Sequence, residues 1–401
     1  MKKQFIKILS LCVLGAITVF VSCNKDDDEI VPDNNGTDVV NTDSIARADS
    51  IARADSIARA DSIARADSIA KADSIAKIDT VKPVRKVYFL NEGTWGANNS
   101  TLDMYYPDGE NTYQSKIFAA ANGKGLGDTG QDLIAYGNRI YVSVWGSNYL
   151  AKLDAQGKIV EKHEFTADEG QPRYLAAKDG FVYVSTYGGK VIKFDTTAIA
   201  TSKGSVEIGT HPEEICINGN SLYAVIAGDY TVAYDSTLAV VDLTNFTLKE
   251  KIVVGVDPTN VVSVADNLYV VHHNTTTWAQ EIMEVNPATK TSTLFDDGSK
   301  MATDGVNFFY VKSFTDWNTY ATVTSFVKKG SNTSPLDLTS TPELSSATVY
   351  LFEIDPENGD FYVGTTDYKT NGVIYRFGKD GKFITKFETS GISPNSAAFL
   401  K

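Results

Sequence analysis

Seven aromatic residues recur at corresponding places in the chain, each a short distance after an apolar segment that contains a tyrosine. The segments are marked by Tyr88, Tyr141, Tyr183, Tyr223, Tyr269, Tyr310 and Tyr362. The aromatic residues follow four to nine positions later and include all four tryptophans of the protein; they are Trp95, Trp145, Tyr187, Tyr230, Trp278, Trp317 and Tyr368. Flat aromatic faces bind sugar rings and planar macrocycles through dispersion and CH–π contacts. The pattern predicts a binding surface if the seven loops are equivalent; the alternative is that each ring packs on a neighbouring loop.

Residues suited to catalysis or metal binding form no recognisable motif. The four histidines are His163, His211, His272 and His273, and only the last two are adjacent. Neighbouring residues of a strand face opposite ways, so this pair does not readily hold one metal ion. No zinc motif, nucleophile elbow or phosphate loop is present. We therefore predict no catalytic residues and no metal site, although a pair of carboxylates among the many acidic residues stays open.

The tyrosine segments are 40 to 53 residues apart, which is the spacing of blades built from four short strands. Between them lie alternating segments rich in Val, Ile, Tyr and Thr, separated by turn sequences such as Asp179-Gly180 and Asn218-Gly219. Residues 84–401 are therefore predicted to form an all-β, seven-bladed β-propeller. Lys86–Leu90 lacks a preceding strand and Ser393–Phe399 lacks a following one, so we expect these terminal strands to pair and close the ring.

In this arrangement two sets of loops open on the same face. The loops between the second and third strands carry the aromatic residues. The segments that lead into the innermost strands surround the central channel, and they carry Gln131, Asp132, Arg173, Tyr174, Glu213, Glu214, Asn260, Lys300, Met301 and Asn395. His273 follows a strand on the same face. From these sets we predict ligand contacts by the seven aromatic residues and by Asp132, Arg173, Glu214, Asn260, His273 and Asn395.

The amino terminus has the features of an exported lipoprotein. Residues 1–22 read as a signal peptide, with Lys2, Lys3 and Lys7 before an apolar stretch. Ser22-Cys23 resembles a bacterial lipobox, which implies lipidation of Cys23. Residues 23–42 read as a flexible linker, and its lysine and acidic run from Asn24 to Glu29 resembles the surface-export signal of Bacteroidetes lipoproteins. These resemblances imply a lipid-anchored protein on the outer face of the outer membrane.

Residues 43–82 repeat Asp-Ser-Ile-Ala-Arg-Ala with a period of six. That period spreads the isoleucines over three stripes of a helix, so no apolar face forms and a coiled coil is excluded. Each Asp precedes a basic residue by four positions, which is a favourable pairing on a helix surface. We predict a stalk that is a solitary charged helix or is partly disordered.

The net charge and the cysteine content of the chain bear on its partners and on its chemistry. The net charge of −13 argues against nucleic acid as a partner. Cys12 and Cys23 lie in the signal region, which leaves Cys216 as a free thiol, expected to be a small core residue.

The blades resemble those of YVTN or YncE-like seven-bladed propellers, in which Gly-x-x-Pro precedes a strand, a turn and Tyr-Val. The matching pairs are Gly209 and Pro212, Gly255 and Pro258, and Gly391 and Pro394. The stretch from Phe89 to Ser100, with Asn91-Glu92-Gly93 and Trp95, is similar to Bacteroidetes surface propellers that include the BtuG-type cobalamin-capture lipoproteins. This resemblance implies a surface protein that binds cobalamin or a related corrinoid, as ligand and not as cofactor, and passes it to a TonB-dependent transporter.

Three other functions stay open from the sequence. A glycan-binding propeller beside a polysaccharide transporter would use the same aromatic residues. A propeller lyase or hydrolase would need His or carboxylate groups at the centre, and a structural or protein-binding propeller would have no small-molecule site.

Overall fold

The computed structural model describes residues 50–65, 84–108, 112–316 and 321–401. The chain divides into two compact units, Met1–Thr80 and Val81–Lys401. The predicted signal peptide, Cys23, the linker 23–42 and both ends of the repeat segment lie outside the described residues. Within the described residues, no helix combines the length and apolar character needed to span a bilayer.

The described part of the repeat segment is a helix over residues 50–65. Its isoleucines are solvent-exposed, with Ile51, Ile57 and Ile63 at 61%, 63% and 63%. Ser56 and Ser62 donate their hydroxyls to the carbonyls of Arg53 and Arg59, at 2.8 Å in each case. In this part of the chain the repeat is therefore helical and has no buried face, as its period predicts.

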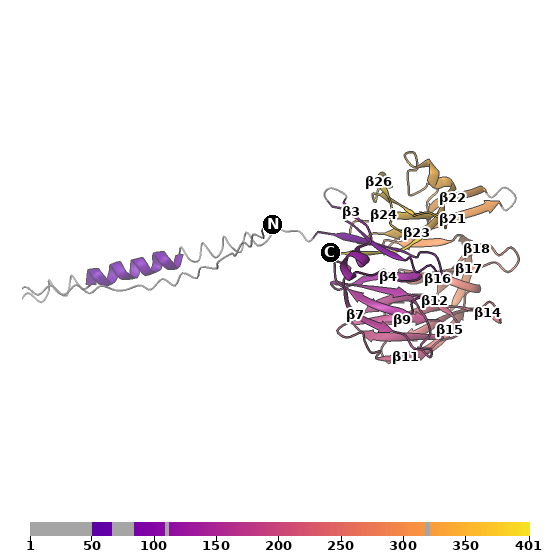
Figure 1. The fold of residues 1–401 in the computed structure, drawn as a ribbon, viewed down its shortest axis with the longest axis horizontal. Coiled ribbons are helices and arrows are strands. Elements are labelled where there is room, and N and C mark those ends of the chain that lie inside the picture. Colours follow the sequence, from indigo (N-terminus) through magenta and orange to yellow (C-terminus); the bar gives the residue numbers. More distant parts are fainter. Residues whose placement is uncertain (1–49, 66–83, 109–111, 317–320) are drawn as a thin grey trace, which may run out of the picture. The chain divides into compact units, whose positions relative to one another are not determined.

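The second unit is a propeller of seven antiparallel sheets, which we number as blades 1 to 7 (Figure 1). Blade 1 consists of β27 (Pro394–Leu400), β1 (Lys86–Asn91), β2 (Thr101–Tyr105) and β3 (Tyr113–Gln114), and blade 2 of β4 (Gly130–Tyr136), β5 (Arg139–Val144), β6 (Tyr149–Leu153) and β7 (Ile159–Glu164). Blade 3 consists of β8 (Pro172–Lys178), β9 (Phe181–Thr186), β10 (Lys190–Asp195) and β11 (Gly204–Glu207). Blade 4 consists of β12 (Pro212–Asn218), β13 (Ser221–Asp229), β14 (Ala233–Asp242) and β15 (Thr247–Val253).

Blades 5 to 7 continue the same order from the innermost strand outward. Blade 5 consists of β16 (Val256–Val264), β17 (Asn267–His273), β18 (Gln280–Asn286) and β19 (Thr291–Asp297). Blade 6 consists of β20 (Lys300–Thr303), β21 (Phe308–Asp316) and β22 (Ala321–Lys328). Blade 7 consists of β23 (Thr348–Ile354), β24 (Phe361–Thr366), β25 (Val373–Phe377) and β26 (Phe383–Glu388). A short helix, α2 (Ile117–Asn122), follows β3, and a 3₁₀ turn, η1 (Pro342–Ser346), precedes β23.

Blade 6 differs from the prediction of four strands in every blade, since its described part has three. The segment after β22 contains Gly330, Pro335 and Pro342 and lacks the alternation of apolar and polar residues that an outer strand needs. Leu336 and Leu344 of this segment are buried in the apolar cluster between blades 6 and 7. The loop and η1 therefore cover apolar surface that a fourth strand covers elsewhere.

The core is divided into seven apolar clusters, one between each pair of neighbouring blades. Each of the seven marker tyrosines is buried in one of these clusters, with exposures of 0% to 7%. In six blades the tyrosine of the second strand faces the next blade, whereas Tyr310 of blade 6 faces the preceding blade 5. The need to fill a boundary between blades explains why a tyrosine recurs with the period of the repeat. Burial of these large rings holds neighbouring blades together.

The Gly-x-x-Pro motif marks the place where the chain crosses from one blade to the next. A Cβ atom at Gly255 would lie 2.3 Å from His272 Nδ1, and one at Gly391 would lie 2.8 Å from Asn91 Cβ. Because the crossing segment passes directly over the end of the second strand, only glycine fits there. The motif is therefore a packing requirement of the propeller.

The ring is closed as predicted by antiparallel pairing of β27 with β1, with Tyr88 opposite Ala398 and Lys86 opposite Leu400. Figure 1 shows the C-terminal end of the chain beside the purple strands with which the propeller begins. Arg376 of blade 7 reinforces the seam. Its guanidinium group forms a buried ion pair with Asp360, at 2.6 Å, and donates to the Pro107 carbonyl of blade 1 at 2.8 Å.

Replacing Arg376 by Met tests this seam. The change leaves the Asp360 carboxylate buried without its cation, so we expect a loss of about 3–5 kcal/mol in the free energy of unfolding. Urea unfolding of the chain from residue 24 measures this loss. The matched control is Lys382→Met, which removes an exposed pair with Asp380 and should change the free energy by less than about 1 kcal/mol. Equal effects of the two changes would contradict the role of Arg376.

Candidate functional site

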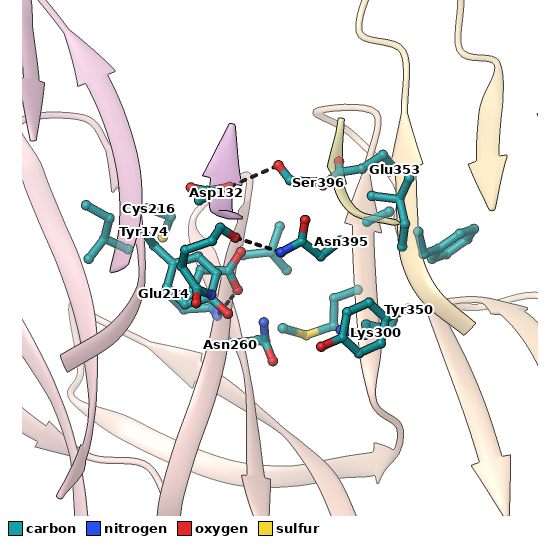
Figure 2. Close-up of a pocket in the computed structure, with 18 of the residues that line it drawn as sticks. Asp132, Tyr174, Glu214, Cys216, Asn260, Lys300, Tyr350, Glu353, Asn395 and Ser396 are labelled. Carbon is teal, nitrogen blue, oxygen red and sulfur yellow. Dashed lines mark hydrogen bonds between the residues drawn. The ribbon is translucent and has the colours of Figure 1, made fainter. Parts of the chain in front are cut away.

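All seven innermost strands contribute to a central cavity of about 410 Å³. Figure 2 shows side chains from several blades converging on this space. The cavity is lined by Glu92, Gln131, Asp132, Arg173, Tyr174, Glu214, Ile215, Cys216, Asn260, Val261, Val262, Lys300, Met301, Ala302, Thr303, Tyr350, Leu351, Phe352, Glu353, Asn395 and Ser396. Polar groups come mainly from the first residues of each strand, while the apolar residues continue into the blades.

Strand irregularities explain why polar side chains face the cavity. The pairing of the innermost and second strands shifts register in six of the seven blades, with blade 6 as the exception. In blades 3 and 4, for example, the shift lies between Pro172 and Leu175 and between Pro212 and Ile215. A β-bulge leaves its extra residues unpaired and redirects their side chains. Arg173, Tyr174, Glu213 and Glu214 are such residues.

Arg173 is the centre of a hydrogen-bonded group at one side of the cavity. It pairs with Glu213 through two nitrogens, one of them at 2.9 Å, and it donates to Gln131. The Glu213 carboxylate also accepts the hydroxyl of Tyr187 at 2.5 Å, and the Tyr187 ring lies 4.7 Å from the guanidinium carbon. The pKa of Arg173 is raised, although burial opposes this, because the Glu213 carboxylate stabilises its charge. Glu213 is not a lining residue but fixes Arg173, which is.

Asp132 joins three blades. Its carboxylate accepts the backbone N–H groups of Leu133 and Leu175, each at 2.8 Å, and the hydroxyl of Ser396 at 3.0 Å. Burial raises the pKa of Asp132, and these hydrogen bonds oppose the increase. This residue therefore contributes to the cavity wall mainly as a link between blades 1, 2 and 3.

Three further ionisable groups face one another across the cavity. Burial raises the pKa of Glu214 to about 7, and burial together with the charges of Glu214 and Asp132 raises the pKa of Glu353 to about 8. Burial lowers the pKa of Lys300, which the nearby carboxylates partly offset. Ionisable groups with such shifts in one cavity are typical of functional sites.

The aromatic residues that follow the second strands lie on the face where the cavity begins. Strands within a blade are antiparallel, so the loop between the second and third strands is on the same side as the start of the first. Four of these residues are strongly exposed: Trp95 at 76%, Tyr230 at 77%, Trp278 at 46% and Tyr368 at 59%. We call these four the rim aromatics. Large apolar rings left in solvent mark interaction surfaces.

Short hydrogen-bonded turns fix the loops of the rim aromatics. Asp229, Asn274 and Asp367 precede Tyr230, Trp278 and Tyr368, and each accepts backbone N–H groups of its own loop at 2.7–3.0 Å. In the loop of Trp95, Asn99 accepts the N–H of Thr94 at 2.8 Å and Asp128 accepts that of Gly96 at 3.0 Å. Trp278 and Tyr368 have φ angles of 60° and 61°, a left-handed conformation that is unusual for bulky residues. The exposed rings are therefore presented by rigid loops.

The other aromatic residues of the predicted set do not share this exposure. Trp145 and Tyr187 are half-buried and pack edge to face, with ring centroids 6.2 Å apart. Tyr187 also stacks on His211 at 4.4 Å. In blades 2 and 3 these rings therefore pack against neighbouring residues, which is the alternative to a binding surface that the sequence left open. Trp317 lies outside the described residues, so its predicted role stays a prediction.

Of the predicted polar residues, Asp132, Arg173, Glu214, Asn260 and Asn395 line the cavity, and His273 does not. The His273 ring stacks on Trp278, with centroids 5.2 Å apart, and its Nδ1 lies 3.0 Å from a carboxylate oxygen of Asp257. That hydrogen bond raises the pKa of His273. His273 therefore supports a rim aromatic and does not point into the centre.

Several cavity residues have no signal in the sequence. Glu353 lies in β23, within the apolar segment from Val349 to Ile354, and Tyr350 and Ser396 are ordinary strand residues. Cys216 packs against the apolar cluster between blades 4 and 5, as expected of a small core residue, and it also lines the cavity, where burial raises the pKa of its thiol. Among the described residues, no group of three or more His, Cys, Asp or Glu side chains is placed to hold a metal ion.

The raised pKa of Glu353 predicts a pH-dependent stability. Between about pH 4.5 and 8 the folded protein retains a proton that the unfolded chain releases, so stability falls with rising pH by at most about 1.4 kcal/mol per pH unit. Glu353→Gln removes this group, and the stability of the variant relative to the original should increase from pH 5 to pH 8. Urea unfolding at several pH values measures it. Glu164→Gln, at an exposed carboxylate, is the control, and parallel profiles for E353Q and the original protein would contradict the assignment.

Solved structures similar to this chain are propeller-like in fold and distant in sequence. Hydrazine synthase of Kuenenia stuttgartiensis has a TM-score of 0.54 and 12% identity, covering 67% of this chain and 89% of its own. A functionally unknown protein from Desulfotomaculum acetoxidans has a TM-score of 0.50 and 14% identity, covering 79% of this chain and 99% of its own. At these identities the likeness concerns the fold alone. No curated protein matches the sequence.

A family model matches residues 85–389 and so spans the propeller from the segment before β1 to the end of blade 7. The matched region contains the whole cavity wall except Asn395 and Ser396 of β27, and it contains all four rim aromatics. The chain belongs to the family described as Domain of unknown function, DUF5074.

Proposed function

We propose that this protein captures a small ligand on the propeller face where the central cavity and the rim aromatics occur together. The presence of the cavity and the rim aromatics on one face is the observation that supports the proposal. The cavity volume of about 410 Å³ falls in the range of about 300–1,000 Å³ that is usual for small-molecule sites. The rim supplies apolar contact area, and the cavity supplies polar groups that orient the ligand.

Cobalamin or a related corrinoid is the ligand that we propose first. A corrin ring is broad and flat, so it would lie across the mouth against the rim aromatics, with amide arms directed into the cavity. The rigid loops favour such a ligand, because little conformational entropy is lost when the rings make contact. The similarity of the Phe89–Ser100 stretch to surface propellers of the BtuG type supports this choice.

The amino-terminal segments would determine where in the cell the protein binds its ligand. A lipid on Cys23 would anchor the protein at the outer membrane, on the cell surface, and the repeat segment would hold the propeller away from the bilayer. The captured ligand would then pass to a TonB-dependent transporter. The exposed isoleucines of helix 50–65 agree with a spacer, since the helix buries no face of its own.

A surface glycan is the second candidate. Tyr234 lies beside Trp278, with centroids 5.0 Å apart, which makes a two-ring platform at the rim. Such platforms suit the faces of sugar rings, and the carboxylates and amides of the cavity suit sugar hydroxyls. This candidate uses the same face and differs in the shape of the ligand.

Titration of the chain from residue 24 with cyanocobalamin tests the proposal, with tryptophan fluorescence and calorimetry as readouts. We expect one-to-one binding, weakened roughly 2- to 10-fold by each of Trp95→Ala, Trp278→Ala and Tyr368→Ala through loss of ring contacts. Val306→Ala is the matched control, because Val306 is 80% exposed in the loop between β20 and β21 on the opposite face. Absence of binding at micromolar protein would reject the corrinoid, and binding of maltohexaose with the same variant effects would favour a glycan.

Deleting two repeats, residues 49–60, tests the spacer role. We expect the affinity of the purified protein for its ligand to stay unchanged, because the propeller forms a separate compact unit. Uptake of the ligand by cells should change instead. A change in affinity would show that the repeats take part in binding.

A further inference from the structure

Most polar groups of the cavity wall are already satisfied by other groups of the protein. Asp132 accepts three hydrogen bonds, and Arg173 is bonded to Glu213 and Gln131. Glu92 accepts the hydroxyl of Tyr350, and the amide nitrogen of Asn395 donates to the carbonyls of Gly130 and Gln131 at 2.8 and 3.0 Å. Asn395 Oδ1 is buried without a hydrogen-bond partner among the described residues. The other polar groups named here are bonded within the wall and retain little capacity for a ligand.

Lys300 and Glu353 differ from the rest of the wall. Within the described ranges, neither side chain has a hydrogen bond or an ion pair, although both line the cavity. The closest interaction of the Lys300 ammonium group is with the ring of Tyr350, whose centroid lies 4.9 Å away. Both side chains are half-buried, and their polar atoms reach the cavity without a protein partner in the described part of the chain, so these two groups are suited to bind something that enters the cavity.

The charges around them disfavour an ionic ligand. An anion attracted to Lys300 would meet the acidic side chains of Glu92, Asp132 and Glu214, which line the same space. A cation attracted to the carboxylates would meet Lys300 and Arg173. Because the space is small and partly desolvated, either repulsion is significant. A group that is neutral and has both a donor and an acceptor avoids both.

We propose that Lys300 and Glu353 hold a neutral polar group of the ligand, a primary amide or a hydroxyl, inside the central cavity. This inference rests on the proposed capture function and adds the chemistry of the inner subsite. The Lys300 ammonium donates to the oxygen of the ligand group. Glu353 binds the same group from β23, on the neighbouring blade.

The protonation of Glu353 adds a pH dependence. The groups that face Glu353 are Glu214 from β12, Asp132 from β4 and Lys300 from β20, with Glu92, Arg173 and Tyr350 elsewhere in the wall. Its pKa of about 8 means that at pH 7 the carboxyl group keeps its proton and donates to the ligand oxygen. Above pH 8 the group loses its proton and can no longer donate to the ligand oxygen, which only Lys300 then holds. Affinity should therefore fall as pH rises from 7 to 9.

The test compares the original chain from residue 24 with Lys300→Met, Glu353→Gln and the control Glu164→Gln, using cyanocobalamin, which carries amides, and maltohexaose, which carries hydroxyls and no amide, as probes. Lys300→Met should weaken binding roughly 10- to 100-fold, the usual effect of losing a hydrogen bond to a charged group. Glu353→Gln keeps a neutral donor, so its affinity at pH 7 should change less than about twofold and should fall less than that of the original chain up to pH 9. Glu164→Gln, at an exposed carboxylate outside the cavity, should change neither the affinity nor its pH dependence. Lys300→Gln replaces Lys300→Met if thermal unfolding shows that Met disturbs the fold.

The outcomes separate this inference from the capture function. Weakening by Lys300→Met together with a pH dependence that Glu353→Gln reduces supports the inner subsite, and binding of maltohexaose identifies a hydroxyl as sufficient. Binding that depends on the rim aromatics but is unaffected by both cavity variants overturns the subsite and leaves capture standing. If neither probe binds, the capture function is contradicted and the subsite with it.

Discussion

The pairing of β27 with β1 is the interaction on which the site depends. It joins the last strand of the chain to the first strand of the propeller and makes blade 1 from both ends. Because the seven apolar clusters lie between blades, each blade needs two neighbours to bury its faces, and an open ring would leave two faces in water. Closure therefore sets the position of all seven innermost strands at once. The cavity is the space that remains where those strands begin.

Closure also explains the electrostatics of the cavity. Bulges at the start of the innermost strands turn polar side chains toward the axis, and the ring gives them no other direction. Some find partners across blade boundaries, as Arg173 does with Glu213 and Asp132 with Ser396. Others, such as Glu353 and Lys300, are brought together without a hydrogen bond in the described part of the chain. The shifted pKa values are thus consequences of a geometry that the apolar clusters impose.

The architecture could be predicted from the sequence because its signals are local and repeated. The buried tyrosines, the turn sequences and the unpaired terminal segments each depend on only a few neighbouring residues. The fourth strand of blade 6 was expected from the average spacing, and the segment rich in Ser, Thr and Pro after β22 forms a loop instead. Exposure of the aromatic residues depends on the adjacent blade. Tyr187 bonds to Glu213 and packs on His211, whereas Trp95 has no such neighbour among the described residues and is exposed. Glu353 could not be found because its role comes from residues more than fifty positions away, including Glu214 and Lys300.

The two parts of the candidate site differ in how they hold their shape, and this difference bears on specificity. The loops of Tyr230, Trp278 and Tyr368 are fixed by side-chain-to-backbone hydrogen bonds within each loop, so each of these hydrogen-bonded turns can form without the others. The loop of Trp95, in contrast, is also held by Asp128 of the next blade. The cavity residues are fixed by contacts between blades, and a change there affects several strands. Within a family that shares this propeller, altered rim loops would change the size and shape of the ligand that is accepted. The cavity would keep its preference for the chemical group at the inner end, because the same side chains that would bind that group belong to the strands that hold the ring together.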